Sequence, residues 1–161
     1  MLSIFPVSSG AKDIDINFRG MVKQSSCDVD STSQNMQVNM GQVKVNQFTG
    51  PGSVVNQKQF TLSLSNCQNV ESVDIYMTGQ PDAINPDYFA LTNVSDAADG
   101  IALQITTVTG GLHSPRGNII NTPINYAAVK QLHYIASYVQ TKGSVQTGKA
   151  NSIADFTIVY K

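Results

Sequence analysis

The chain has 161 residues, which suffices for one domain with its own core, and no segment reaches the roughly 20 apolar residues of a membrane-spanning helix. Hydrophobic residues make up 41% and charged residues 13%, about half the globular average of roughly 25%. The net charge of −1 arises from scattered residues without a basic run, which excludes electrostatic recruitment of nucleic acid or of an anionic membrane. Such a charge-poor composition is typical of β-rich extracellular proteins.

Residues 1–11 are interpreted as a leader or the remnant of a signal peptide. The short apolar stretch Met1–Val7 precedes the small residues Ser9 and Ala11, which have the small-x-small spacing of a signal-peptidase site. An ordinary N-terminal strand is the alternative interpretation of the same residues.

Apolar and polar residues alternate in many short runs along the chain. A period of two is typical of strands with one buried face. The apolar positions of these runs are Ile14, Ile16 and Phe18; Met36, Val38 and Met40; Phe60, Leu62 and Leu64; Val73, Ile75 and Met77; Ile101, Leu103 and Ile105; Leu132, Tyr134, Ala136 and Tyr138; and Ala154, Phe156, Ile158 and Tyr160. Sequences rich in Gly, Pro, Asn and Asp separate the runs, so we predict an all-β sandwich or barrel.

Residues 126–137 fit two patterns. The spacing of Ala128, Leu132 and Ile135 is compatible with a helix, whereas Tyr134 and Tyr138 follow the period of two. Because tyrosine is a good strand former, we predict a strand here.

The sequence contains none of the common catalytic or nucleotide-binding signatures. There is no G-x-S-x-G, H-E-x-x-H, Walker loop or G-x-G-x-x-G. The two histidines are candidate bases, but we expect both at the solvated surface. His133 lies on the polar phase of its strand between Leu132 and Tyr134, and His113 follows a Gly-rich loop. We expect no enzymatic activity.

The two cysteines, Cys27 and Cys67, are too few to form a zinc site with the two histidines at the usual spacings. They form either one disulfide, which implies an oxidising compartment, or two buried free thiols. Four aspartates gather in turn sequences, and we expect them to form turns rather than an ion site: Asp82, Asp87, Asp96 and Asp99. We expect no metal and no cofactor.

Several stretches of the chain are similar to one family. They are residues 16–22 followed by Cys27, residues 38–43, residues 60–67 ending on Cys67, residues 88–91 and residues 100–105. In addition, Gly148 stands fourteenth from the end of the chain and Tyr160 is the penultimate residue. From about Asp13 to Lys161, the sequence resembles a pilin of the chaperone–usher pathway, of the type 1 fimbrial kind.

This resemblance implies an incomplete immunoglobulin-like β-sandwich that lacks its final strand and carries a Cys27–Cys67 disulfide. A groove along the core, between the first and last strands, is completed by a donor strand. In the family, a periplasmic chaperone lends this strand first, and an outer-membrane usher then replaces it with the N-terminal extension of the next subunit. Main-chain bonds and alternate side chains bind such an added strand.

The resemblance also assigns the parts of the chain. Residues 12–20 are expected to be the donor-strand extension and residues 21–161 the pilin domain. The expected site residues are Ile14, Ile16, Phe18 and Gly20 in the donor strand; Val22, Phe156, Ile158 and Tyr160 in the acceptor groove; and Gly148, Tyr160 and Lys161 in contact with the chaperone.

The function implied by the resemblance is that of a structural subunit in a fimbria that supports cell adhesion. The subunit is exported through the periplasm and polymerises head to tail, with copies of itself or with other pilins, on the surface of a Gram-negative bacterium. The alternative is a single-domain adhesin that binds a host glycan or a host protein receptor through its loops. A weaker alternative is a secreted sandwich hydrolase.

Overall fold

The structure is a computed structural model, and it describes residues 14–20 and 25–161. Strands dominate the described residues, accompanied by one short 3-10 helix. The elements in chain order are β1 (Ile14–Gly20), β2 (Ser26–Val29), β3 (Met36–Val38), η1 (Val45–Gln47), β4 (Val54–Gln68), β5 (Ser72–Gly79), β6 (Ile101–Thr107), β7 (Leu112–His113), β8 (Ile120–Pro123), β9 (Lys130–Gln140) and β10 (Ile153–Tyr160).

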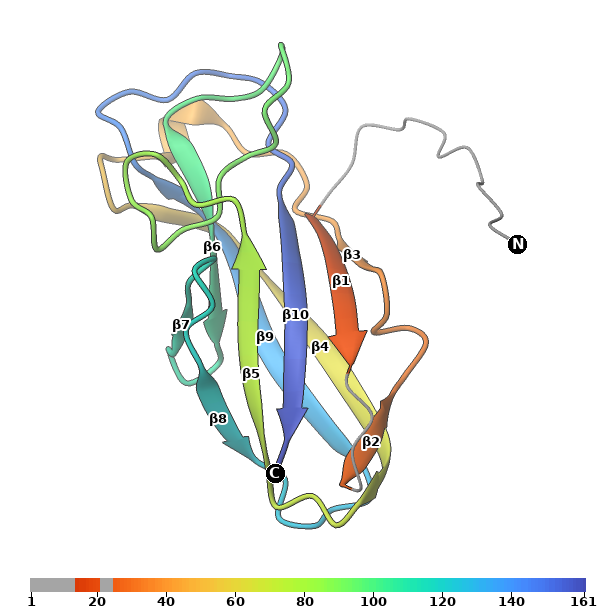
Figure 1. The fold of residues 1–161 in the computed structure, drawn as a ribbon. Coiled ribbons are helices and arrows are strands. Elements are labelled where there is room, and N and C mark those ends of the chain that lie inside the picture. Colours follow the sequence, from red (N-terminus) through yellow and green to blue (C-terminus); the bar gives the residue numbers. More distant parts are fainter. Residues whose placement is uncertain (1–13, 21–24) are drawn as a thin grey trace.

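The strands form two sheets that pack face to face as a sandwich (Figure 1). One sheet has the order β3-β1-β10-β5-β8, and the other has the order β2-β4-β9-β6-β7. The longest ladder is antiparallel and joins β4 to β9 at the centre of the second sheet. The prediction of an all-β sandwich is confirmed.

The core is built by the alternation seen in the sequence. On β4, Leu62 and Leu64 are fully buried, and on β5 the residues Val73, Ile75 and Met77 are fully buried. Intervening positions on both strands are partly exposed. Because successive side chains of a strand point to opposite faces, this pattern turns one face of each sheet toward the other.

Aromatic rings occupy the middle of this core. Tyr134 of β9 stacks on Phe60 of β4 with ring centroids 5.4 Å apart, and it meets the ring of Phe156 edge-on at 5.6 Å. Phe60 and Phe156 are 6.3 Å apart in a T-shaped pair. Aromatic contacts of this kind add to the stabilisation that burial of the rings supplies. The cluster therefore connects the central ladder of one sheet to the last strand of the other.

The prediction of a strand near residues 126–137 is confirmed from Lys130 onward, where β9 begins. Residues 126–129 precede it, and Asn125 and Tyr126 form a turn. The stretch 88–91, one of those similar to the family, forms no regular strand and makes isolated bridges at Phe89 to Pro81 and to Leu103. Proline cannot donate to a ladder, which prevents a regular strand pair at Pro81.

The expectation that His113 is solvated is wrong. His113 lies on β7 in register with Ile105 of β6, and its side chain is completely buried. Its ring meets that of Tyr134 edge-on with centroids 5.5 Å apart. Pairing with a core-facing residue places His113 on the core side of the sheet. His133, by contrast, is exposed as predicted.

Within the part of the chain that the structure describes, no helix combines the length and hydropathy needed to cross a membrane.

Candidate functional site, the seam between β3 and β10

The seam is the place where an N-terminal strand fills the gap between β3 and the last strand. β1 pairs in parallel with β10, where Ile16, Phe18 and Gly20 lie in register with Ala154, Phe156 and Ile158, respectively (Figure 1). On its other side β1 pairs antiparallel with β3. β1 is thus hydrogen-bonded on both edges, and it joins two strands that do not pair with each other.

The wall of the seam formed by β10 is apolar toward the core. Ala154, Phe156, Ile158 and Tyr160 are buried, while the residues between them are partly exposed. On its far edge β10 pairs antiparallel with β5 along its whole length. A strand that is fixed on one edge and has a buried apolar face offers its second edge to a pairing partner.

The phenol of Tyr160 links this wall to the start of the domain. Its hydroxyl donates a hydrogen bond to the carbonyl of Cys27, with an oxygen–oxygen distance of 3.1 Å. Burial, and then the charge of Asp28, raise the pKa of Tyr160, so the phenol stays protonated at neutral pH and remains a donor.

The strand after β1 is fixed by a disulfide. Cys27 on β2 is bonded to Cys67 on β4, which confirms the disulfide interpretation over two free thiols. The bond closes a sequence separation of 40 residues. β2, the first strand after β1, is therefore held against the end of β4.

The C-terminal residue is tied to β5 by main-chain and side-chain bonds. The Lys161 amide donates to the Ser72 carbonyl at 2.9 Å, and the Lys161 ammonium lies 2.8 Å from the carboxylate of Asp74. The hydrogen bond from Lys161, followed by one from Asn121, lowers the pKa of Asp74. The end of β10 is thereby fixed beside β5.

Gly148 lies five residues before β10, where two segments of backbone come very close. A Cβ atom at this position would lie 2.4 Å from the carbonyl carbon of Ala97 and 2.4 Å from the amide nitrogen of Ala98. Gly148 therefore lets the segment that leads into β10 pack against residues 96–98.

A cavity of about 490 Å³ lies beside the segment that leads into β10. Met40, Phe48, Tyr138 and Val145 contribute apolar walls, and Gly148 forms part of its rim. The alternating runs of the sequence include Met40, Ile101 and Tyr138 from this lining, and the family resemblance includes Gly148. The remaining lining residues lie in irregular segments and in η1, which carry no periodic signal.

The four aspartates that gather in turn sequences are engaged locally. Asp82 accepts hydrogen bonds from the amides of Ile84 and Asn85, while Asp96 and Asp99 pair with lysines at 2.8 Å. Among the residues that the structure describes, no group of three or more His, Cys, Asp or Glu side chains could hold a metal ion.

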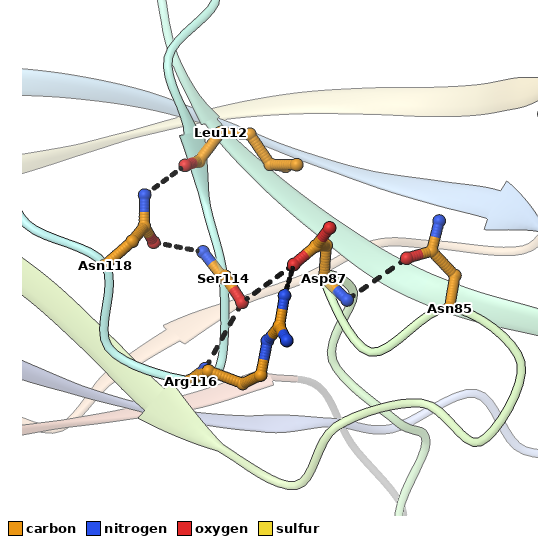
Figure 2. Close-up of polar contacts among 6 residues, drawn as sticks. All are labelled: Asn85, Asp87, Leu112, Ser114, Arg116 and Asn118. Carbon is orange, nitrogen blue, oxygen red and sulfur yellow. Dashed lines mark hydrogen bonds and ion pairs between the residues drawn. The ribbon is translucent and has the colours of Figure 1, made fainter.

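Asp87 belongs to a polar network that holds the loop after β7 in place (Figure 2). Its carboxylate pairs with the guanidinium of Arg116 and accepts a hydrogen bond from the Ser114 hydroxyl at 3.3 Å. Asn118 accepts from the Ser114 amide at 2.6 Å and donates to the Leu112 carbonyl at 2.9 Å. These bonds fix the loop that follows the buried His113, so the network is a structural support.

Val22, expected in the acceptor groove, lies outside the described residues. The other expected site residues lie in two regions. Ile14, Ile16, Phe18 and Gly20 are on β1, and Phe156, Ile158 and Tyr160 are on β10 beside it, whereas Gly148 and Lys161 precede and follow β10. The seam thus brings the expected donor segment next to the expected groove within one chain.

The two packed sheets form an immunoglobulin-like β-sandwich. An N-terminal strand completes it by pairing with one edge of the last strand. The family model described as "Fimbrial protein" matches residues 16–161, and the chain belongs to this family. The family consists of structural proteins and not of enzymes, and the chain is a structural fimbrial subunit. It forms part of an extracellular pilus together with other subunits.

Two curated relatives illustrate the similarity. Protein LpfE of Salmonella typhimurium is 32% identical over 151 residues, covering 91% of this chain and 83% of that protein. Long polar fimbria protein A of the same organism is 30% identical over 161 residues, covering 99% and 89%, respectively.

Solved structures share the fold. The Burkholderia pseudomallei antigen and type I fimbria protein has a TM-score of 0.66 at 27% identity, covering 92% of this chain and 94% of that one. The P pilus rod subunit PapA has a TM-score of 0.69 at 17% identity, covering 84% and 99%. The fold predicted from the sequence resemblance is therefore confirmed.

Proposed function

We propose that this subunit joins its neighbours by donating residues 12–20 to the groove of another subunit, while its own groove receives the same segment from a third. The positions that enter the groove are Ile14, Ile16, Phe18 and Gly20, and the receiving positions are Val22, Phe156, Ile158 and Tyr160. Residues 21–161 form the body that carries the groove, and residues 1–11 form a leader that takes no part in pairing.

The observation that supports this proposal is the position of β1. This strand lies between β3 and β10, paired on both edges, although only residues 21–25 connect it to β2. A segment that is bonded to the sandwich through its edges and attached by one covalent connection can be replaced by an identical segment from a second copy. Such replacement keeps every main-chain bond type and changes only the molecule that supplies the strand.

The energetics favour a filled groove over an empty one. Full burial of each large apolar side chain contributes about 1.5–3 kcal/mol, so several donor positions supply several kcal/mol before any main-chain bond is counted. An empty groove leaves the apolar face of β10 and the unpaired edges of two strands exposed to water. The subunit therefore requires a strand at this position in every state, and assembly consists of exchanging one strand for another.

The proposal extends to the export route. In it, a periplasmic chaperone supplies the strand before assembly, and it contacts the end of the chain at Tyr160, Lys161 and the approach to β10 at Gly148. An outer-membrane usher then replaces the chaperone strand with the arm of the next subunit. The disulfide between Cys27 and Cys67 is consistent with passage through an oxidising periplasm.

A variant without residues 1–20 tests the proposal directly. Purified with an excess of a synthetic peptide that comprises residues 12–20, it should form a one-to-one complex, which native mass spectrometry detects. The matched control is the same peptide carrying Ile16→Asp and Phe18→Asp, which should not bind because a buried charge opposes insertion. A truncated chain that folds fully alone and ignores the unmodified peptide would overturn the proposal.

A further inference from the structure

The turn between β8 and β9 places a tyrosine in a backbone conformation that L residues rarely adopt. Asn125 and Tyr126 have φ angles of 55° and 58°, and the Ala127 amide donates to the Ile124 carbonyl at 3.2 Å. Positive φ at both central positions is the signature of a type I′ turn, in which glycine is preferred at the second position. Tyr126 therefore occupies a strained position, and 66% of its surface is exposed. Strain at an exposed large residue points to a role outside the folding of the domain.

Tyr126 is part of an exposed apolar surface, which we name the turn patch and define as Tyr126, Ala128 and Val129. Val129 is 61% exposed, and Ala128 is also exposed. The backbone beneath the turn patch is fixed, because the Tyr126 amide donates to the Val70 carbonyl at 2.9 Å and the Cys67 amide donates to the Ala128 carbonyl at 3.0 Å. The turn patch is thus a firmly held surface whose side chains face solvent.

The turn patch lies near the point where the arm, meaning the donor segment of residues 12–20, joins the rest of the domain. Its backbone is bonded to Cys67, which is joined by the disulfide to Cys27 on β2, the first strand after the arm. The β8–β9 connection, β2 and the C-terminus all lie at the same end of the sandwich (Figure 1). Between Gly20 and Ser26 stand residues 21–25, which span at most about 18 Å when fully extended. A subunit that holds the arm in its groove must therefore lie close to this end.

We propose that the turn patch is a docking surface for a second copy of this chain, namely the copy whose groove holds the arm. This inference rests on the proposed function. The occupant follows from the length of the connection, which brings that copy to this end of the domain, and from the chemistry of the turn patch. Residues 125–129 carry no charge, and 13% of the chain is charged, so two copies meet here with little desolvation of ionic groups. The contact buries the tyrosine ring that the strained turn holds in solvent.

The substitution Tyr126→Gly separates docking from folding. Glycine suits the turn, so the thermal midpoint of the monomer should stay the same or rise, whereas the ring that contacts the neighbour is lost. In arm-exchanged oligomers of the purified full-length chain, labelled subunits should leave about tenfold faster than in the wild type. Val129→Ser should act in the same direction. The matched control is Ile119→Ser, because Ile119 is 63% exposed and precedes β8, which β10 and β5 separate from β1 in the sheet.

A photo-crosslinking phenylalanine analogue at position 126, compared with the same analogue at position 119, identifies the partner. Crosslinked dimers from position 126 and none from position 119 support the docking surface. An excess of the peptide of residues 12–20 tests whether the oligomers depend on the arm. Peptide-sensitive oligomers without a crosslink at position 126 overturn this inference and leave strand exchange intact. If the wild-type chain forms no peptide-sensitive oligomer, strand exchange between copies and this inference are both overturned.

Discussion

The β4–β9 ladder and the β1–β10 seam belong to different sheets and are held together in different ways. β4 has 15 residues and β9 has 11, and they pair antiparallel at the centre of their sheet. β1 has 7 residues, pairs in parallel with β10, and its connection to β2 consists of residues 21–25. Parallel pairs are slightly less stable per residue than antiparallel ones. The comparison supports the proposal that the antiparallel ladder stabilises the domain and that the seam is the position at which a strand is exchanged.

Three contacts connect these regions. The disulfide fixes β2 to β4, and the hydroxyl of Tyr160 joins β10 to the carbonyl of Cys27. The aromatic cluster joins Phe156 of the seam to Tyr134 of the ladder. Substitutions at these connections show how far the ladder and the seam act independently.

The largest effect is expected from removing the disulfide. In the chain-entropy model, a crosslink across the sequence separation of 40 residues stabilises the fold by about 4 kcal/mol. The double substitution Cys27→Ser and Cys67→Ser should therefore lower the free energy of unfolding by about that amount in urea titration. Wild-type protein treated with a reductant serves as the control and should behave in the same way. A loss below about 1 kcal/mol would show that the ladder alone holds β2 in place.

A comparable loss of stability is expected at acidic pH, from protonation of the buried His113 on β7. Burial lowers the pKa of His113 to about 4, and among the described residues neither ring nitrogen has a hydrogen-bond partner. The folded state therefore resists protonation that the unfolded chain accepts near pH 6.5. The stability present above pH 6.5 should decrease as the pH falls toward 4, by about 3 kcal/mol in total from this group.

Matched histidine substitutions check this pH dependence. His113→Leu should flatten the dependence of the urea midpoint on pH between 6.5 and 4, and His133→Gln, at an exposed position of β9, serves as the control for replacing a histidine outside the core. An unaltered pH profile in the His113 variant would mean that carboxylates, rather than the core histidine, determine the acid response.

The central ladder was predictable from the sequence, because Phe60, Leu62 and Leu64 alternate with polar residues over a long run. The same period revealed β5 and β10. His113 was not placed correctly, because β7 has only 2 residues, and a period of two cannot be recognised in so short a strand. Its burial results from pairing with Ile105, a tertiary contact that local sequence does not encode.

The seam was predictable in part. Alternation at Ile14, Ile16 and Phe18 predicts a strand, and the resemblance to a known family suggested its function. Neither observation determines whether the strand pairs with β10 of its own chain or of another copy, or whether the pairing is parallel or antiparallel. Strand pairing joins residues far apart in the sequence, so local patterns do not specify it. In the structure, β1 pairs in parallel with β10 of its own chain. The turn at Asn125 and Tyr126 was not predicted either, because no sequence pattern marks a tyrosine at a turn position where glycine is preferred.

A smaller effect is expected at Gly148, where the approach to the seam packs against residues 96–98. The substitution Gly148→Ala forces a Cβ into backbone atoms only 2.4 Å away, and overpacking of this kind costs about 1–3 kcal/mol. The thermal midpoint should fall accordingly. Gly143→Ala is the matched control, because a Cβ there meets no atom within 4 Å and should leave the midpoint nearly unchanged. Equal midpoints for the two variants would show that the loop around residues 96–98 yields without cost.

The smallest effect is expected from Tyr160→Phe, which removes one hydrogen bond between the seam and β2 but keeps the ring. The bond spans 3.1 Å, and its loss leaves the Cys27 carbonyl without this donor, at a cost of about 1 kcal/mol. Since the bond joins β10 to β2 rather than β4 to β9, hydrogen exchange should accelerate in β10 and β2 and remain unchanged in the central ladder. Tyr76→Phe on β5 is the matched control, because Tyr76 lies on the outward, partly exposed phase of its strand. Uniform acceleration across both sheets would contradict the separation of ladder and seam, because it would mean that the two regions unfold as one unit.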